Sequence, residues 1–373
     1  MLNLSVPVLV YQITPSVSLL GTAALAANLP AFIGSPLGGV WADRYSKRLI
    51  LLAALAAQAS LTFLLYRVSL GDALTVPLLL GLATAIGFAS SVNLSAYQAL
   101  VAEIVPARQL RPAYKLNAIQ FNLSRAVGPA IAGFVLARWG ASAAFLINAL
   151  AHIPLALVLL SIRPRSLPRA ATTNAFDEIL SAAKITWHTP ALRVALLTVC
   201  VSSAFGMSVQ QLGKGLTEQV FHVDDSGLGL LVASIGAAAV VTALLTALLG
   251  DRFRGSSLTR LGLVVYGLGL WVVAATDTFS IGLAGFAITG FAHVLVNVSV
   301  TTAIQTHVPD AFRGRVTSLQ LMGIILSMAF GAQLGGLIGD SQGLPTVIAL
   351  FGASLMAYAA FAQTQLGGLR ALD

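Results

Sequence analysis

The sequence predicts an all-α integral membrane protein of twelve helices, arranged as two sets of six. The first observation is composition: 57% of the 373 residues are hydrophobic and 9% are charged, with a mean hydropathy of +0.88. A globular core in water cannot hide that much apolar side chain. Nine long stretches also lack Asp, Glu, Lys and Arg, and most reach the ~20 residues that a helix needs to cross a bilayer. Polarity does not alternate along them, which favours helices over membrane strands.

The first six helices are predicted between breaks that contain Pro, Gly, Ser or charged residues. Their ranges are Leu2–Ile13, Val17–Trp41, Leu49–Tyr66, Leu74–Ala102, Ala113–Ala137 and Ser142–Ile162. The first range is shorter than the ~20 apolar residues that span a bilayer, so helix 1 is expected to be truncated, with the sequence beginning near its middle.

Residues 163–190 combine several prolines with mixed charges. This composition predicts a cytoplasmic linker with one amphipathic segment. The second six helices are expected at 191–213, 226–249, 258–276, 279–305, 315–339 and 344–364. The chain is therefore predicted to form an N-terminal six-helix bundle (1–162), a linker (163–190) and a C-terminal six-helix bundle (191–373).

Basic residues concentrate on one side of this predicted topology. Alternate threading places 17 of the 21 Lys and Arg residues on the side that holds the linker. Because basic loops favour the cytoplasmic side, we expect a multi-pass protein of the inner membrane with its linker and basic loops in the cytoplasm. A nucleic-acid partner is not expected, since the basic residues occupy short loops without interleaved aromatic residues.

Landmarks recur along the chain at a nearly fixed spacing. Val105-Pro106 corresponds to Val308-Pro309, and Gly128 corresponds to Gly331, each pair separated by 203 positions. Many transporters consist of two such repeats. Both repeats begin on the same side of the predicted membrane, so they are expected to be parallel.

Several motifs resemble the major facilitator superfamily of transporters. The stretch GVWADR (39–44), followed by Lys47-Arg48, is similar to its signature between helices 2 and 3, and Gly250–Arg252 resembles a weaker copy between helices 8 and 9. The stretches 97–106 and NLSRAVGPAIAG (122–133) resemble the branch that contains macrolide-efflux proteins and the enterobactin exporter. The resemblance implies a 12-helix (6+6) major facilitator fold and transport of the drug:proton antiporter type.

The resemblance also implies a gate that latches the two halves on the cytoplasmic side. Its expected members are Gly39, Asp43, Arg44, Arg48, Asp251, Arg252 and Arg315. The carboxylate of Asp43 could accept hydrogen bonds from the N–H groups that begin helix 11, because helix N-termini attract anions. The alternative is that these charges only fix topology, although topology alone does not require an aspartate.

Small residues at regular spacing predict close contact between helices. The expected interface positions are Gly34, Gly38, Gly128, Pro129, Gly133, Gly331 and Gly335. In the superfamily that this chain resembles, helix 2 faces helix 11 and helix 5 faces helix 8, so the glycines would allow the halves to rock. The alternative is ordinary helix packing without movement. Pro129 is expected to bend its helix because it removes one backbone hydrogen bond.

Polar residues inside the predicted spans are candidates for substrate or proton binding, because such residues are unfavourable in a bilayer. They are Arg125, Asn93, Tyr97, His152, His293 and Asn297. Arg125 either binds an anionic group of the substrate or forms a structural bridge. The two histidines could titrate near neutral pH, so each either carries a proton or packs as an ordinary hydrogen-bonded side chain.

We therefore expect a secondary transporter that exports an amphipathic or hydrophobic small molecule, drug or siderophore-like, by alternating access with a proton as coupling ion. Its expected partners are this substrate, the proton and lipid, with a monomeric chain and no cofactor. The sequence has no phosphate loop and no catalytic or metal motif in a supporting context, so no enzyme activity or metal site is predicted. The alternatives are a truncated non-transporting protein or sensor, or a lipid flippase or importer with the same fold.

Overall fold

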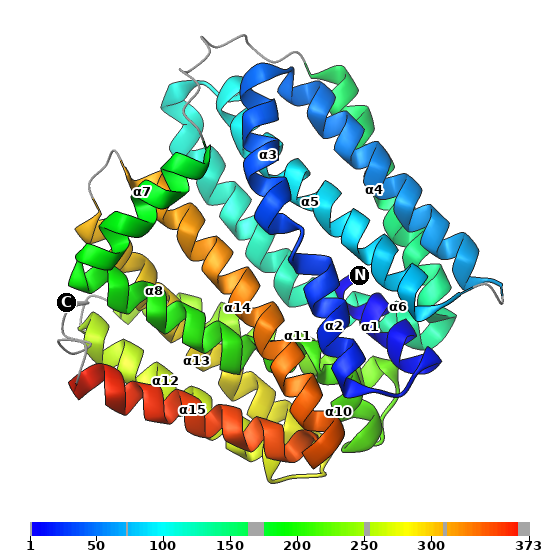
Figure 1. Cartoon of the computed structure of the whole chain (residues 1–373), viewed down its shortest axis with the longest axis vertical. Coiled ribbons are helices and arrows are strands. Elements are labelled where there is room, and N and C mark those ends of the chain that lie inside the picture. Colours follow the sequence, from blue (N-terminus) through cyan, green and yellow to red (C-terminus); the bar gives the residue numbers. More distant parts are fainter. Residues whose placement is uncertain (1, 72–73, 163–174, 250–253, 309–311, 365–373) are drawn as a thin grey trace.

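The computed structural model describes residues 2–71, 74–162, 175–249, 254–308 and 312–364, and the regular elements of this part of the chain are helices (Figure 1). The spans before the linker are called the first set. They are α1 (Leu2–Ile13), α2 (Val17–Asn28), α3 (Ala31–Arg44), α4 (Lys47–Ser69), α5 (Val76–Ile104) and α6 (Leu110–Ser161).

The predicted amphipathic segment of the linker forms α7 (Ala175–His188), which packs against the spans that follow it. Those spans are called the second set. They are α8 (Pro190–Ser202), a π-helical turn (Ser203–Met207), α9 (Ser208–Gln211), α10 (Gly213–Gln219), α11 (Asp225–Leu249), α12 (Gly255–Ala274), α13 (Phe279–His307), α14 (Arg313–Gln342) and α15 (Leu344–Thr364).

The helix predicted over Val17–Trp41 is interrupted in the structure. It breaks at Leu29 and Pro30 into α2 and α3. Pro30 has no backbone N–H, so the regular hydrogen-bond pattern of α2 cannot continue through it. The break changes the neighbours of the chain: α2 packs against both α14 and α5, whereas α3 packs mainly against α5.

Two predicted spans lie within the single assigned helix α6. They meet at Gly140, whose φ of 77° and ψ of 177° are not helical. A positive φ is easily adopted only by glycine, so Gly140 allows an abrupt change of direction within a few residues. This turn falls inside the break that the sequence predicts at Arg138–Ala141.

The buried side chains form clusters that join the two sets. The largest cluster lies among the helices of the second set but includes Val17 and Leu20 of α2. A second cluster lies among the helices of the first set but includes Leu228 and Val232 of α11. Burial of apolar surface therefore stabilises the contacts of α2 with α14 and of α6 with α11, as well as each set by itself.

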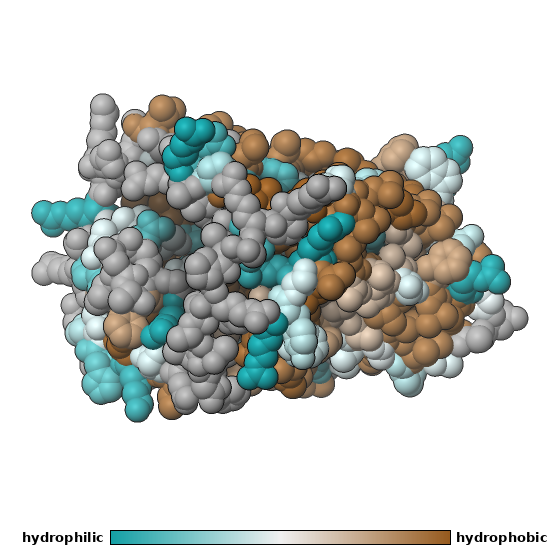
Figure 2. Space-filling model, turned by 90° about the horizontal axis from the view of Figure 1, so that it is seen from above, coloured by the Kyte–Doolittle hydropathy of each residue, from teal (hydrophilic) through white to brown (hydrophobic). Residues whose placement is uncertain are grey.

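Much of the remaining apolar surface faces outward. Ten helices in the described residues are long and apolar enough to cross a membrane. Large side chains such as Leu49, Phe134 and Leu157 are 60% or more exposed. Figure 2 shows broad brown areas on one face, with hydrophilic residues gathered mainly toward its left and right ends. An outer surface of this kind is matched to the hydrocarbon core of a bilayer.

Candidate functional site

A cavity of about 1170 Å³ lies between the first and second sets. Its walls come from α1, α2, α3 and α5 on one side and from α14 on the other, with Gln211 of α9 also contributing. In Figure 1, α2 and α14 lie side by side at the lower right, and α3 and α14 diverge toward α7 at the upper left. The volume is at the upper end of the range for small-molecule sites, so a ligand of drug size or larger fits.

Some of the predicted site residues do line this cavity. The side chain of Asn93 has no hydrogen-bond partner among the described residues. The hydroxyl of Tyr97 donates to Oδ1 of Asn117 on α6 at 3.2 Å, which ties α5 to α6. The guanidinium carbon of Arg315 lies 5.5 Å from the ring centroid of Phe312. The predicted site residues in the wall are Gly39, Asn93, Tyr97 and Arg315.

The other candidates with described side chains are not among the described lining residues. His152 donates through Nδ1 to the main-chain carbonyl one turn earlier in α6, at 2.7 Å. His293 of α13 packs edge-on against the ring of Tyr266 on α12, with centroids 6.1 Å apart. Oδ1 of Asn297 accepts from the hydroxyl of Thr301 at 3.2 Å. The structure thus gives each of these residues a contact within or between helices.

The predicted gate residues Arg44 and Arg48 lie at the end of the molecule that carries α7, here called the α7 end. Arg44 is exposed at the C-terminus of α3. Arg48 donates to the carbonyl oxygen of Leu160 near the end of α6, and the neighbouring Lys47 forms an ion pair with Glu103 of α5. These partners belong to the first set, whereas the sequence places Arg48 in a latch between halves. The last carbonyls of a helix attract cations, which explains the contact with α6.

Several predicted residues lie outside what the structure describes. For some, the backbone is in a helix but the side chain is not described; the others fall between described segments. The first group is Asp43, Arg125 and Pro129, and the second is Asp251 and Arg252.

Gly34 and Gly38, predicted to face helix 11, lie against α5. A Cβ atom on Gly34 would come within 3.1 Å of the carbonyl oxygen of Phe88, and one on Gly38 within 2.9 Å of Cα of Val92. The contact predicted for these glycines is therefore corrected. The physical reason is the break at Pro30, after which α3 packs against α5.

Gly331 and Gly335 contact helices of the second set. A Cβ on Gly331 would lie 2.6 Å from the carbonyl carbon of Ala204 in the π-helical turn, and one on Gly335 would lie 2.9 Å from the Leu212 side chain. Neither contact is with the first set, so this prediction is corrected as well. The face of α14 that meets α2 is offset by one residue from these glycines.

Other glycines make the close approaches between the two sets. A Cβ on Gly21 of α2 would lie 2.5 Å from the carbonyl oxygen of Ala332, and one on Gly336 would lie 2.6 Å from that of Val17. Gly133, which the sequence did predict, lies directly against Gly229 of α11. For Gly128, five residues earlier in α6, a Cβ would meet no described atom within 4 Å.

The end of the molecule opposite α7, here called the Asp340 end, is held by a carboxylate of one set and a helix N-terminus of the other. Asp340, near the end of α14, accepts from the backbone N–H of Val17 at 2.7 Å and of Ser18 at 3.1 Å. It also accepts from the hydroxyl of Ser16 at 2.8 Å. These donors would otherwise be unsatisfied at the start of α2, so the carboxylate both caps and charge-complements that helix.

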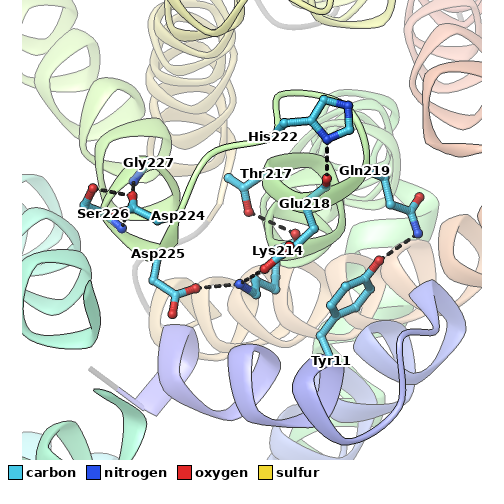
Figure 3. A network of polar contacts seen from close by, with 10 residues as sticks. All are labelled: Tyr11, Lys214, Thr217, Glu218, Gln219, His222, Asp224, Asp225, Ser226 and Gly227. Atoms are coloured by element: carbon cyan, nitrogen blue, oxygen red, sulfur yellow. Dashed lines mark hydrogen bonds and ion pairs between the residues drawn. The ribbon is translucent and has the colours of Figure 1, made fainter. Parts of the chain in front are cut away.

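A polar network beside this contact joins α1, α10 and α11 (Figure 3). Lys214 is only 3% exposed, and its Nζ lies 2.6 Å from Asp225 and 2.5 Å from Glu218. The amide of Gln219 donates to the hydroxyl of Tyr11 on α1 at 2.8 Å, which connects the two sets. Burial alone would lower the pKa of Lys214, but the hydrogen bonds and charges of the two carboxylates outweigh it and raise this pKa.

Sequence reasoning missed Asp340 and Lys214 as partners in these contacts. The signal for the first was the start of α2, where Ser16 at the N-cap position predicts a helix N-terminus. Nothing in the pattern indicates that a carboxylate more than 300 positions later completes that cap. The signal for Lys214 was its location outside the predicted basic side, four residues before Glu218.

Membrane-length helices that surround a cavity between two sets of spans define a multi-pass membrane transporter. Solved transporters share this fold. A bacterial homologue of the human lysosomal transporter Spinster, in an inward-facing, unoccupied conformation, aligns with a TM-score of 0.74 and 16% identity over 99% of this chain and 94% of its own. The nucleoside transporter NupG aligns with a TM-score of 0.72 and 14% identity over 96% of this chain and 95% of its own.

The family model described as "Transmembrane secretion effector" matches residues 3–372, so the chain belongs to this family of the major facilitator superfamily. Curated relatives include the enterobactin exporter EntS of Citrobacter koseri, 26% identical over 99% of this chain and 88% of the exporter. EntS of Salmonella typhimurium is 26% identical over 91% of this chain and 81% of its own length. The chain is therefore a secondary transporter of the inner membrane and not an enzyme.

Proposed function

We propose that this chain exports an amphipathic, siderophore-like small molecule by alternating access, with the cavity as its substrate chamber. The observation that carries the proposal is the unequal packing of the two sets. At the Asp340 end, α2 and α14 are joined by Asp340 and by close glycine contacts, whereas the cavity separates α3 from α14 toward the α7 end. A chamber between two sets of spans that is closed at one end is what alternating access requires.

The proposed moving units are two bundles, residues 1–162 and 191–373, connected by the linker 163–190. Their contacts have the properties of a separable interface. The α2–α14 contact combines close approach of small residues with a few hydrogen bonds, and Thr22 adds one bond to Gln333 at 3.0 Å. Such contacts depend on a close fit and are lost together once the helices separate by a few ångströms.

The α7 end is proposed to face the cytoplasm. Support comes from the basic residues, of which 17 of 21 are assigned to this side, and from the linker that joins the bundles there. The cavity then receives its substrate from the cytoplasm, and the Asp340 end is the exit. The relatives named as enterobactin exporters support a siderophore as the substrate class.

A proton is proposed as the coupling ion, as the resemblance to drug:proton antiporters implies. In that case an inward proton gradient would drive export. His152 and His293 remain the proposed titratable carriers, although the structure provides each with a helix contact away from the cavity wall. Replacing each by Gln separates a proton carrier from a packed side chain, since only a carrier's loss uncouples transport from the pH gradient.

The function is tested with inside-out membrane vesicles that contain the full chain. Enterobactin and a panel of amphipathic drugs are added outside, and accumulation is followed with and without a pH gradient. Export predicts accumulation of at least one compound, and its loss when nigericin collapses the gradient. Equal accumulation in vesicles without the protein, for every compound, would refute export; uptake only in right-side-out vesicles would indicate an importer.

Opening of the exit is tested at Asp340. Replacing Asp340 with Ala removes the acceptor of three hydrogen bonds to α2, so the two sets should separate at this end. Spin labels on Thr14 and Asp277, placed in a C200A background, report the separation by electron paramagnetic resonance. We expect longer distances in Asp340→Ala than in Asp340→Asn, which keeps one carbonyl acceptor. Unchanged distances in both variants would contradict this role for Asp340.

A further inference from the structure

The cavity contains one type of charge. Of its described lining residues, Arg315 is the only one that is charged at neutral pH, and none is Asp or Glu. Two amide side chains on α5, Asn93 and Gln98, lie in the same wall. A chamber of low dielectric with a fixed cation and no carboxylate attracts an anion and repels a cation.

The wall is also divided by polarity. The α14 side carries Arg315 and Ser318, and its other described lining residues are Leu321, Met322, Ile325 and Leu326. Arg315, Met322 and Ile325 are spaced by one or two helical turns, so they fall along one face of α14. An anionic group near Arg315 can therefore be continuous with an apolar body packed along the same helix.

The opposite wall supplies hydrogen-bonding groups. Several serine hydroxyls of α5 already have protein partners: Ser90 donates to Gln58 and Ser91 donates to the carbonyl oxygen of Phe88. The Asn93 amide, in contrast, has no hydrogen-bond partner among the described residues, so it can both donate to and accept from a ligand.

Phe312 supports Arg315 from one side. The guanidinium carbon lies 5.5 Å from the ring centroid, within the range of a cation–π contact. Stacking limits the rotamers of Arg315 without using all five N–H donors, so part of the guanidinium can be directed to a ligand. The sequence places Arg315 in a gate, and the structure adds a place in the cavity wall.

We propose that Arg315 is a specificity-determining residue that selects amphipathic anions and rejects lipophilic cations, with Asn93 reading a neutral polar group. This inference rests on the proposed export function, because it takes the cavity to be the substrate chamber. The ligand class is a molecule with at least one negative charge, an apolar or aromatic body, and hydroxyl or amide groups on the side that faces α5.

Two dyes with the same xanthene ring but opposite charge test the proposal. Sulforhodamine B carries a net negative charge and rhodamine 6G a positive one. Binding to the full chain in lipid nanodiscs is measured by fluorescence polarisation. We expect tighter binding of sulforhodamine B, and a loss of about 10- to 100-fold in Arg315→Gln, as typical for a hydrogen bond to a charged group.

Matched variants separate recognition from folding. Arg260→Gln removes an exposed arginine of α12 that bonds Gln363 at 3.3 Å, and it should leave both affinities unchanged. Arg315→Lys keeps the charge, so it should keep the preference for the anion even if Arg315→Gln does not fold. Arg315→Glu should reverse the preference in favour of rhodamine 6G. Elution as a single species on size exclusion is required of every variant that is compared.

A wild-type protein that does not bind sulforhodamine B more tightly than rhodamine 6G would overturn the proposal, as would an Arg315→Gln variant with unchanged affinity for the anion. Vesicle transport distinguishes this failure from that of the proposed function. Export of a cation, insensitive to Arg315→Gln, would overturn anion selection and leave export standing. Arg315-dependent binding without transport of any compound would do the reverse.

Discussion

Gly133 of α6 is a position at which one methyl group can test the contact between the two sets of spans. A Cβ atom added there would lie 2.9 Å from the backbone nitrogen of Gly229 and 3.2 Å from the carbonyl oxygen of Asp225, and closer still to Cα of Gly229. Ordinary contacts begin at 3.4 Å. The atoms are main chain on a neighbouring helix, so no rotamer change can relieve the overlap, and α6 and α11 must separate.

Gly128 provides the control on the same helix. Its Cβ would meet no described atom within 4 Å, so Gly128→Ala adds the same methyl group without the clash. Both substitutions share the gain in helix propensity, which is at most about 1 kcal/mol and cancels in the comparison. What remains is the overpacking at Gly133, for which core substitutions suggest about 1–3 kcal/mol. The contact with backbone favours the upper part of this range.

The chain itself supplies the assay. Cys200 is its only cysteine and lies half-buried in α8, so a thiol-reactive fluorescent dye reports its exposure on heating. We expect Gly133→Ala to lower the midpoint of this transition by several degrees relative to Gly128→Ala. Spin labels on Thr14 and Asp277 should show a longer distance in the same variant. Identical midpoints and distances for the two variants would refute the packing argument.

The polar network at the Asp340 end gives two further predictions. Asp225→Asn should destabilise the protein by about 3 kcal/mol, since it leaves Lys214 buried with only the half-exposed Glu218 as a counter-charge; the double variant with Lys214→Met should recover part of the loss in a thermal melt. Asp224→Ala should cost roughly 1 kcal/mol, because Asp224 accepts from Ser226 and from the first N–H groups of α11. The hydrogen bond from the Ser226 side chain and those from the backbone lower the pKa of Asp224. Its contribution is therefore present above the unfolded value near 3.8 and lost as the pH falls through the lower folded pKa; a stability difference between wild type and Asp224→Ala that persists unchanged to pH 2 would contradict this.

The helical membrane architecture could be predicted because lipid imposes it locally. A stretch such as 278–309 has no Asp, Glu, Lys or Arg, and within a bilayer it must satisfy its own backbone hydrogen bonds, which requires a helix. The turn at Gly140 and the amphipathic segment in the linker were predictable for the same reason, since each depends on neighbours in the sequence. The family, too, was visible in the motifs at 39–44 and 122–133.

The contacts between distant helices could not be predicted in the same way. The sequence showed that α2, α3 and α14 are rich in glycine, but a single proline at position 30 decided that Gly34 and Gly38 meet α5 while Gly21 meets α14. Residue spacing defines a face of a helix and not the partner of that face.

The sequence by itself determined that this chain lives in lipid as twelve helices and that it carries the motifs of a transporter, because hydropathy and short motifs act over a few turns of helix. The tertiary structure alone decided that Asp340 caps α2, that Lys214 is buried between two carboxylates, and that Arg315 lines the cavity. These are pairings across tens to hundreds of positions, and each depends on how helices tilt and pack, which no local pattern encodes.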